Sequence, residues 1–311
     1  MPLETRGRLL HWPITGAFLF LCIVVILLPM QVLPLTIFLP AVYCLWSERF
    51  SGFKPVLISL IPALLMVYPP FIPGTLLYFA FVFCGFLLSL AVKQRFVGLA
   101  VFVPSVFLGI IFILTMLFLA HKQSMNLAEF MQATVSLMME DVTELYAQMV
   151  TSSDMMDFNM NKATIGNRIL RLSPAILLSG FTFVMWLNLI IIAAIKRNIR
   201  LFSWKSPDWV LLVFVCSAMF YIMVEIVHVF QNKILGLASL NVFLMALHAY
   251  FFQGIAIVGY FFDVRNWNKI FRWLIYLLIL SQVYIMILVI GLGLFDVWFD
   301  FRKRMIKLRR R

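Results

Sequence analysis

Six polar side chains on two long apolar runs are the residues of this chain whose types and spacing could do chemistry. The run Trp209–Phe230 carries Tyr221, Glu225 and His228, and the run Ile234–Phe262 carries Asn241, His248 and Gln253. Residues spaced i, i+4 and i+7 share one face of a helix, and so do residues seven apart. Each run therefore presents a polar stripe, and two such stripes can hydrogen-bond each other across a helix–helix contact.

Glu225 is the acidic residue that the sequence places deepest inside an apolar run, because the other Asp and Glu residues fall in loops, at run ends or in a polar insert. A carboxylate at mid-bilayer costs roughly 2.5–3.5 kcal/mol, so it persists when it is paired, protonated or facing a cavity. We therefore predict that Glu225 is buried and that the six residues form a site for a ligand, an ion or a proton. The alternative is that they only join helices, with Glu225 satisfied by His248 or Asn241 and no ligand.

The sequence contains no recognisable motif for catalysis or for metal binding. The chain has no Walker loop, no G-x-S-x-G, no H-E-x-x-H and no glycine-rich turn between a strand and a helix, so we expect no enzyme and no cofactor. Glu225-x-x-His228 has the spacing of di-iron bundle proteins, which need a second copy and two further glutamates, so we expect no metal. Cysteines fall within apolar segments without paired spacing and are predicted to be packing residues: Cys22, Cys44, Cys84 and Cys216.

The composition is that of a membrane protein. The chain is 64% hydrophobic and only 12% charged, which excludes an ordinary soluble domain. Its net charge of +12 would suggest nucleic acid in a soluble protein, but the basic residues lie between and after apolar runs. The positive-inside rule explains that placement, so we expect the lipid bilayer as partner and no nucleic acid. The last ten residues hold seven Lys or Arg and are predicted to anchor the tail on anionic lipid in the cytoplasm.

Apolar run lengths predict an all-α, polytopic transmembrane helix bundle with about eight spans. The runs are Ile14–Met30, Leu35–Trp46, Pro55–Tyr68, Phe71–Val92, Phe96–Ala120, Leu172–Ile195, Trp209–Phe230, Ile234–Phe262 and Trp273–Phe295. The first follows a basic lead without a small-x-small cleavage site, so an uncleaved helix is expected. We divide the chain into a helical core (1–195), additional transmembrane helices (196–300) and a basic tail (301–311).

Residues 121–168 form the one sizeable polar insert, and they are predicted to contain an amphipathic helix. Asn126 followed by Glu129 has the pattern of an N-cap with a capping box. Apolar residues then recur at helical spacing, while the polar side is acidic, and eight of the 18 methionines lie here. Because Met adapts to varied surfaces, the insert could be a lid or a docking site for a partner. The alternative is a helix that rests on the outer ends of the bundle.

The topology of the last third contains a conflict. Three apolar runs follow the basic segment 196–205, and three crossings would place the basic tail outside, against the positive-inside rule. The run Ile234–Phe262 contains Gly236 and Gly254, so we predict that it is broken, re-entrant or folded as two halves. Broken helices often line sites in transporters, which favours roles for Asn241, His248 and Gln253.

Three strings in the sequence resemble a widespread bacterial family of membrane proteins, the YybS-like family or domain of unknown function 2232. They are FSWKSPDW at 202–209, NVFLMALHAYFFQGIAIVGYFF at 241–262 and GLGLFDVWFDFRKR at 291–304. The likeness covers essentially the whole chain and implies a multi-pass helical fold without an assigned activity. Residues 14–195 also resemble the six-helix core of substrate-capture subunits of energy-coupling-factor transporters. Those subunits place small residues four apart on the first helix, whereas Gly16 and Ala17 are followed by Phe20 and Leu21.

These observations predict a transporter-like protein that binds a small molecule or an ion in a bacterial inner membrane, with its C-terminus in the cytoplasm. The alternative is a structural membrane partner that assembles with other envelope proteins, through residues 121–168 or the C-terminal tail, without a ligand.

Overall fold

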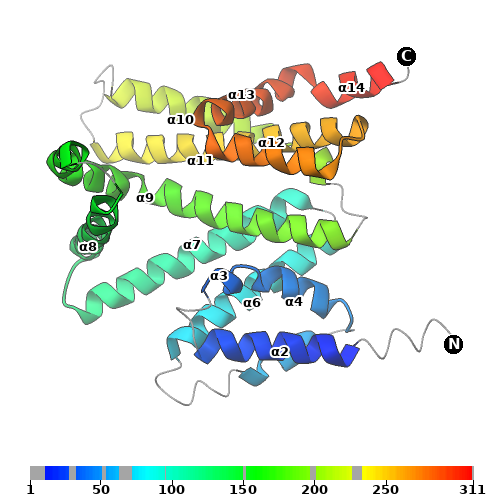
Figure 1. The fold of residues 1–311 in the computed structure, drawn as a ribbon, viewed down its shortest axis with the longest axis horizontal. Coiled ribbons are helices and arrows are strands. Elements are labelled where there is room, and N and C mark those ends of the chain that lie inside the picture. The colour runs from blue at the N-terminus through cyan, green and yellow to red at the C-terminus, as the bar shows by residue number, and fades with distance from the viewer. Residues whose placement is uncertain are drawn as a thin grey trace. The chain divides into compact units, whose positions relative to one another are not determined.

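The computed structural model describes residues 11–27, 33–50, 54–62, 72–94, 96–149, 152–196, 201–225 and 233–309. All regular secondary structure in these ranges is helical, which confirms the all-α prediction (Figure 1). The longer helices are α2 (His11–Leu27), α4 (Leu39–Ser47), α6 (Ile72–Lys93), α7 (Val97–Lys122), α8 (Leu127–Ala147), α9 (Ser152–Ile195), α10 (Trp209–Glu225), α11 (Lys233–Val264), α12 (Lys269–Ser281), α13 (Val283–Phe299) and α14 (Phe301–Arg309). Two short ones, α3 (Leu33–Thr36) and α5 (Lys54–Ser59), flank α4.

Four helical stretches among the described residues are long and apolar enough to cross a membrane: Thr75–Lys93, Val97–Lys122, Phe158–Ile195 and Ile234–Val264. A fifth is reached if α12 and α13, which meet at a bend of 104°, count as one span. The described part of helix α10 is apolar and has 17 residues, about 26 Å at 1.5 Å per residue. The structure therefore shows a multi-pass protein with four or five candidate spans, and eight spans are not shown.

By its internal contacts the chain forms two compact units, each built from two separate parts of the sequence. The first contains residues 1–108 and 180–204, and the second contains 109–179 and 205–311. Helices α7 and α9 are each divided between the two units, at residues 108/109 and 179/180. The division predicted at residue 195 stays a prediction.

In the first unit, the short proline-containing helix α4 packs against α6 and α2. Trp46 stacks on Phe18 with ring centroids 4.2 Å apart. A Cβ at Gly85 would lie 2.8 Å from Cβ of Tyr43, so only glycine permits this approach of α6 to α4. The predicted second apolar piece is thus a short buried helix, and α4 ends beside an ion pair between Glu48 and Lys196.

In the second unit, α8 and the first turns of α9 pack as a helical hairpin. Asn126 accepts a hydrogen bond from the main-chain N–H of Glu129, and the Glu129 carboxylate accepts one from Asn126 N–H. The predicted capping box and the start of the amphipathic helix are therefore confirmed. Helix α9 continues for 44 residues, from the insert through Pro174 to the end of its apolar run, whereas the sequence analysis began this span at Leu172.

Helices α10 and α11 pack against each other in the same unit, with Phe214 of α10 beside Phe243 and Tyr250 of α11. The prediction that Ile234–Phe262 is broken is wrong, because α11 is one continuous helix of 32 residues. Its glycines serve packing instead of breaking the helix. A Cβ at Gly254 would lie 2.0 Å from the carbonyl oxygen of Val289, and one at Gly236 would lie 2.5 Å from Oε1 of Glu225.

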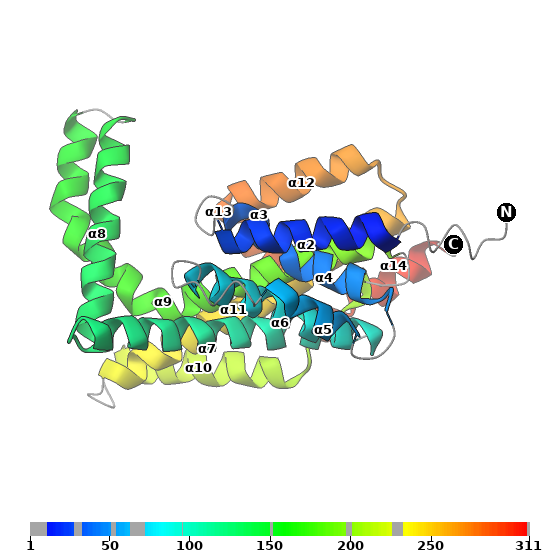
Figure 2. The ribbon, with the colours of Figure 1, turned by 90° about the horizontal axis from the view of Figure 1, so that it is seen from below.

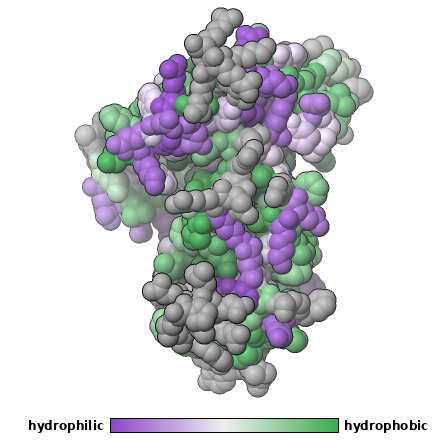
Figure 3. Space-filling model, turned by 90° about the vertical axis from the view of Figure 1, so that its right-hand side faces the viewer, coloured by the Kyte–Doolittle hydropathy of each residue, from purple (hydrophilic) through white to green (hydrophobic). Residues whose placement is uncertain are grey.

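The broken element is the last apolar run. Helix α12 ends and α13 begins at Gln282, whose extended backbone (φ −118°, ψ 111°) turns the chain by 104°. Beyond α13, Asp300 adopts a left-handed conformation (φ 45°), and the basic helix α14 follows. Hydrophilic residues gather near the top of Figure 3, over α14 and the turn between α11 and α12.

Three cysteines are buried free thiols, namely Cys22, Cys44 and Cys84, while Cys216 is a free thiol exposed on α10. Some predicted features lie wholly or partly outside the described residues. They are the basic lead 1–10, the break at Gln31–Pro34, the turn Tyr68–Gly74 and His228.

Candidate functional site

The predicted stripe on α10 is not a buried site in the described residues. Glu225 is the last residue of α10 and is exposed, and Tyr221, one turn earlier, is half-buried. The prediction of a buried mid-span Glu225 is therefore wrong. Glu225 is exposed although its neighbour Val224 is buried, because adjacent residues of a helix lie on different faces. His228, the third residue of the stripe, lies outside the described residues.

Asn241 is buried and joins α11 to α9. Its Oδ1 accepts a hydrogen bond from Ala175 N–H (3.0 Å), and its Nδ2 donates to the carbonyls of Arg171 (3.0 Å) and Leu237 (2.9 Å). Ala175 and Arg171 are four residues apart around Pro174, which lacks an N–H and disturbs its helical turn. Asn241 thus binds both main-chain groups of the disturbed turn, the interhelical role that the sequence analysis gave as an alternative.

The same arrangement occurs in the first unit. Asn188 of α9 accepts from Ala41 N–H (2.8 Å) and donates to the carbonyls of Ile37 and Val184 (both 2.8 Å). Here too the bridged groups are four residues apart and flank a proline, Pro40. In both places a buried amide on one helix completes a proline-disturbed turn on another. The matching pattern supports a structural role for these asparagines.

His248 lies on α11 among aromatic rings, with Phe252 edge-on at 4.7 Å between ring centroids. Its imidazole hydrogen-bonds the main chain of Ser179 on α9, while its Nε2 is buried without a partner in the described part of the chain. Residues 171 and 175 of α9 contact residue 241 of α11, and residue 179, farther along α9, contacts residue 248, farther along α11. Helices α9 and α11 therefore run parallel here.

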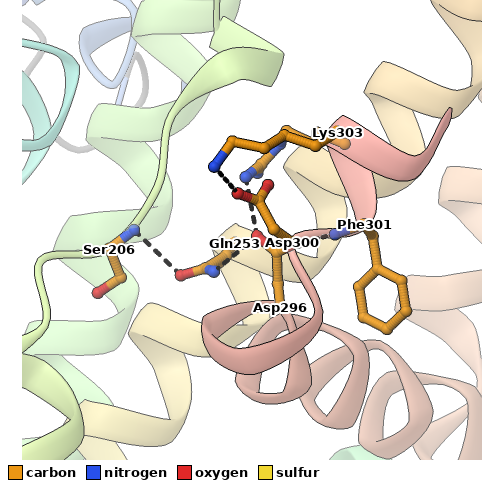
Figure 4. A network of polar contacts seen from close by, with 7 residues as sticks. Ser206, Gln253, Asp296, Asp300, Phe301 and Lys303 are labelled. Atoms are coloured by element: carbon orange, nitrogen blue, oxygen red, sulfur yellow. Dashed lines mark hydrogen bonds and ion pairs between the residues drawn. The ribbon is translucent and has the colours of Figure 1, made fainter. Parts of the chain in front are cut away.

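Gln253 leads to a buried polar cluster that the sequence analysis missed (Figure 4). Its Oε1 accepts from Ser206 N–H (3.0 Å), just before α10, and its Nε2 donates to Oδ2 of Asp296 (3.1 Å) on α13. Gln253 and Asp296 are both 0% exposed. We call Ser206, Gln253, Asp296 and Arg302 the Asp296 cluster.

Asp296 is the fully buried carboxylate, in place of the predicted Glu225. Its Oδ2 also accepts from Nη1 of Arg302 (2.9 Å), and its Oδ1 accepts from Phe301 N–H (2.8 Å), the first amide of α14. A charged partner and an amide at a helix N-terminus both stabilise a carboxylate. Burial lowers the pKa of Arg302, and the neighbouring Asp296 opposes that shift. The pair fixes the corner between α13 and α14.

A close crossing of α11 and α13 places these groups together. A Cβ at Gly293 would lie 2.0 Å from the carbonyl oxygen of Tyr250, and Gly254 faces Val289 equally closely. Gln253 precedes Gly254, and Asp296 lies nearly one turn after Gly293, so the crossing brings amide and carboxylate into contact. Around the corner, Asp300 pairs with Lys303, which lowers the pKa of Asp300 and raises that of Lys303.

Ser206 Oγ, in this cluster, and Tyr250 OH, three residues before Gln253 on α11, are buried without a hydrogen-bond partner in the described part of the chain. Buried polar atoms rarely lack partners, and an orphaned group often marks a bound water, ion or ligand. No group of three His, Cys, Asp or Glu side chains suited to a metal occurs in the residues searched.

The sequence matches, over residues 16–297, the family described as "Predicted membrane protein (DUF2232)". The chain belongs to this family. The comparisons found no curated protein and no solved structure that matches, so the resemblance to transporter subunits gains no support from them.

The match to DUF2232 includes Gln253 and Asp296 but ends before Asp300 and Arg302. The sequence carried one signal for Asp296: it is followed by Val297, Trp298 and Phe299, so the apolar character continues beyond the acid. Asp296 lies in the last turn of α13, and Arg302 follows it by six residues, so the two can form a buried pair when the chain turns between them. That turn at Asp300 is not readable from the apolar pattern alone.

Proposed function

We propose that this member of the DUF2232 family is a transporter-like protein that binds a small polar molecule or ion beside the Asp296 cluster. The observation that carries the proposal is a buried charged pair, Asp296–Arg302, in a cluster that also contains the orphaned hydroxyl of Ser206. Ionisable residues buried in membrane proteins are expensive and commonly mark ion or substrate sites. The proposed activity is binding, without catalysis.

The interruption between α13 and α14, at Asp300, supports this proposal. Discontinuous helices in transporters place the ends of half-helices at substrates and ions. The end of α13 carries Asp296, and the first amide of α14 points at the carboxylate. A polar molecule bound there would find donors and acceptors already oriented.

We further propose that α12 and α13 form a re-entrant hairpin, which enters and leaves the membrane on one side. Two crossings, α10 and α11, would then separate the basic segment 196–205 from the tail, so both lie in the cytoplasm as the positive-inside rule requires. Ser206 is linked through Gln253 to Asp296, and the charge of Lys205 acts on Asp300, which supports this because the segment before α10 then lies close to the start of the tail. The membrane is proposed to be a bacterial inner membrane.

Native mass spectrometry of the purified chain tests the binding proposal, with two matched variants. Tyr250→Phe removes the orphaned hydroxyl on α11, three residues before Gln253, and Tyr276→Phe removes another buried orphaned hydroxyl, on α12. We expect a retained small molecule in the wild type and in Tyr276→Phe, and its loss in Tyr250→Phe. An empty wild type, or equal retention by both variants, would contradict the proposed site.

A second candidate function is assembly with another envelope protein. It is favoured by the large apolar side chains that α8, which is not among the candidate spans, exposes. It is also favoured by the hydrogen bonds of Asn241 and Asn188, because side chains that already bond the main chain need no ligand.

A further inference from the structure

The helical hairpin formed by α8 and the first turns of α9 is stiffened by its own packing. Phe130 and Met139 of α8 are buried, and the rings of Tyr146 and Phe158 lie 4.8 Å apart. A Cβ at Gly166 would make ordinary contacts of 3.6 Å with Met139 and Val135, so the two helices are closely packed. Figure 2 shows the hairpin projecting away from α10 and α11 of the same unit. Its outer surface is therefore preformed.

The outer face of α8 carries a stripe of apolar and acidic side chains. Leu137, Asp141, Glu144 and Leu145 share one helix face by their spacing, and Met138 borders it; we call these five residues the α8 stripe. Leu137 is 63% exposed, Met138 52% and Leu145 57%. Large apolar residues clustered on an extramembrane helix are typical of an interaction surface. The exposed methionine suits such a surface, since its flexible side chain adapts to a partner.

The charge of α8 decides which occupant the stripe fits. The helix carries Glu129, Glu140, Asp141 and Glu144 and has no Lys or Arg. Anionic lipid headgroups would repel these carboxylates, which disfavours the membrane surface. The α8 of a second copy has the same four acids, so a homotypic contact would oppose like charges.

We propose that the α8 stripe docks a basic amphipathic helix of a partner protein. The partner's apolar residues would cover Leu137, Met138 and Leu145, and its Lys or Arg residues would pair with Asp141 and Glu144. Helix recognition of this kind uses apolar anchors one or two turns apart, with charges that set orientation. This inference does not depend on ligand binding at the Asp296 cluster.

The test uses the full chain in nanodiscs of zwitterionic lipid and two synthetic helical peptides. One peptide has a Leu face flanked by Lys, and the other has Glu in place of every Lys. By fluorescence anisotropy, we expect the wild type to bind the Lys peptide and not the Glu peptide. The double variant Asp141→Lys/Glu144→Lys should bind the Lys peptide at least about tenfold more weakly and gain affinity for the Glu peptide.

Two further variants separate the stripe from general charge effects. Leu137→Ser/Leu145→Ser should weaken Lys-peptide binding about tenfold without loss of helix content, because both side chains are exposed. Asn159→Lys/Asn167→Lys adds positive charge at exposed positions of α9 and should leave binding unchanged within about twofold.

Three outcomes would overturn the proposal. The Lys peptide could fail to distinguish the wild type from Asp141→Lys/Glu144→Lys, whether both bind it equally or neither binds it above empty nanodiscs. The wild type could form a concentration-dependent dimer that Leu137→Ser/Leu145→Ser abolishes, which would make a second copy the occupant. In the absence of peptide, vesicles of anionic lipid could bind the wild type and not Leu137→Ser/Leu145→Ser, which would make the membrane the occupant.

Discussion

At the scale of single residues, the buried carboxylate of Asp296 accepts hydrogen bonds from Gln253, Phe301 and Arg302. Breaking a buried ion pair leaves an uncompensated charge, which is far more costly than losing an exposed pair. We expect Asp296→Ala to lower the free energy of unfolding by about 3 kcal/mol, because the buried Arg302 would lose the carboxylate with which it forms an ion pair.

The measurement is reversible unfolding of the purified chain in detergent micelles. Asp300→Ala is the matched control, because Asp300 pairs with Lys303 at the exposed side of the same corner. It should destabilise the protein much less than Asp296→Ala. Similar losses for both variants would show that Asp296 is not the residue that fixes the corner.

Asp300 also predicts a pH dependence. Its pKa is lowered in the folded protein, first by the hydrogen bond from Lys303. Its stabilising contribution is therefore present above the ordinary carboxyl pKa and is lost as the pH falls through the lowered value. The pKa of Lys303 is raised, so its part of the same interaction is lost only as the pH rises through that value.

The difference in Tm between wild type and Asp300→Asn should thus stay constant between about pH 5 and about pH 9 and shrink in more acidic buffer. Thermal unfolding over this range measures it. A difference that grows in acid would contradict the sign of the shift.

At the scale of elements, the crossing of α11 and α13 depends on glycines that face main-chain atoms. Gly293→Ala would place a methyl group 2.0 Å from the Tyr250 carbonyl, so α13 must move away from α11. We expect Gly293→Ala to destabilise the protein by about 3 kcal/mol. Gly291→Ala, two residues away on α13, meets nothing within 4 Å and should be neutral or stabilise by up to about 1 kcal/mol. Equal effects in thermal unfolding would rule out the tight crossing.

The proline-disturbed turn of α9 gives a prediction about coupling between two helices. Asn241→Ala removes the partner of Ala175 N–H and should cost about 1–2 kcal/mol. In a Pro174→Ala background the turn can complete its own hydrogen bonds, so Asn241→Ala should cost less. A double-mutant cycle should show a coupling energy of about 1 kcal/mol, and additive losses would contradict the proposed role of Asn241.

At the scale of the whole molecule, the re-entrant hairpin predicts the sides on which the extramembrane segments lie. Cysteines introduced at Lys205 and Arg311, in a variant without Cys216, should be protected from a membrane-impermeant maleimide in intact cells. A cysteine at Ala133 on α8 should react. The parallel course of α9 and α11 supports this, since α10 must then return the chain between them. A reactive position 311 with a protected position 205 would show that α12 and α13 together cross the membrane.

The sequence by itself determined what local patterns encode. Apolar run lengths and low charge determined an all-α multi-pass protein, because an apolar segment of about 20 residues crosses lipid as a helix that satisfies its own main-chain groups. Asn126 and Glu129 determined the start of α8, because a capping box is formed by residues three apart. The strings at 202–209, 241–262 and 291–304 determined the family, which the match over 16–297 confirms.

The tertiary structure alone decided which polar residues are buried and which helix is broken. Glu225 and Asp296 both follow apolar residues, yet Glu225 is exposed, whereas Asp296 is buried by its contact with α11 and by the turn at Asp300. In the sequence Gly254 suggests a break in the helix, yet in the structure it is the point where α11 contacts α13. The break lies at Gln282, where no glycine or proline indicates it. The partners of Gln253, at Ser206 and Asp296, are more than forty residues away along the chain. Hydrogen bonds between such distant residues depend on how helices cross, and the spacing of residues along one helix does not specify that crossing.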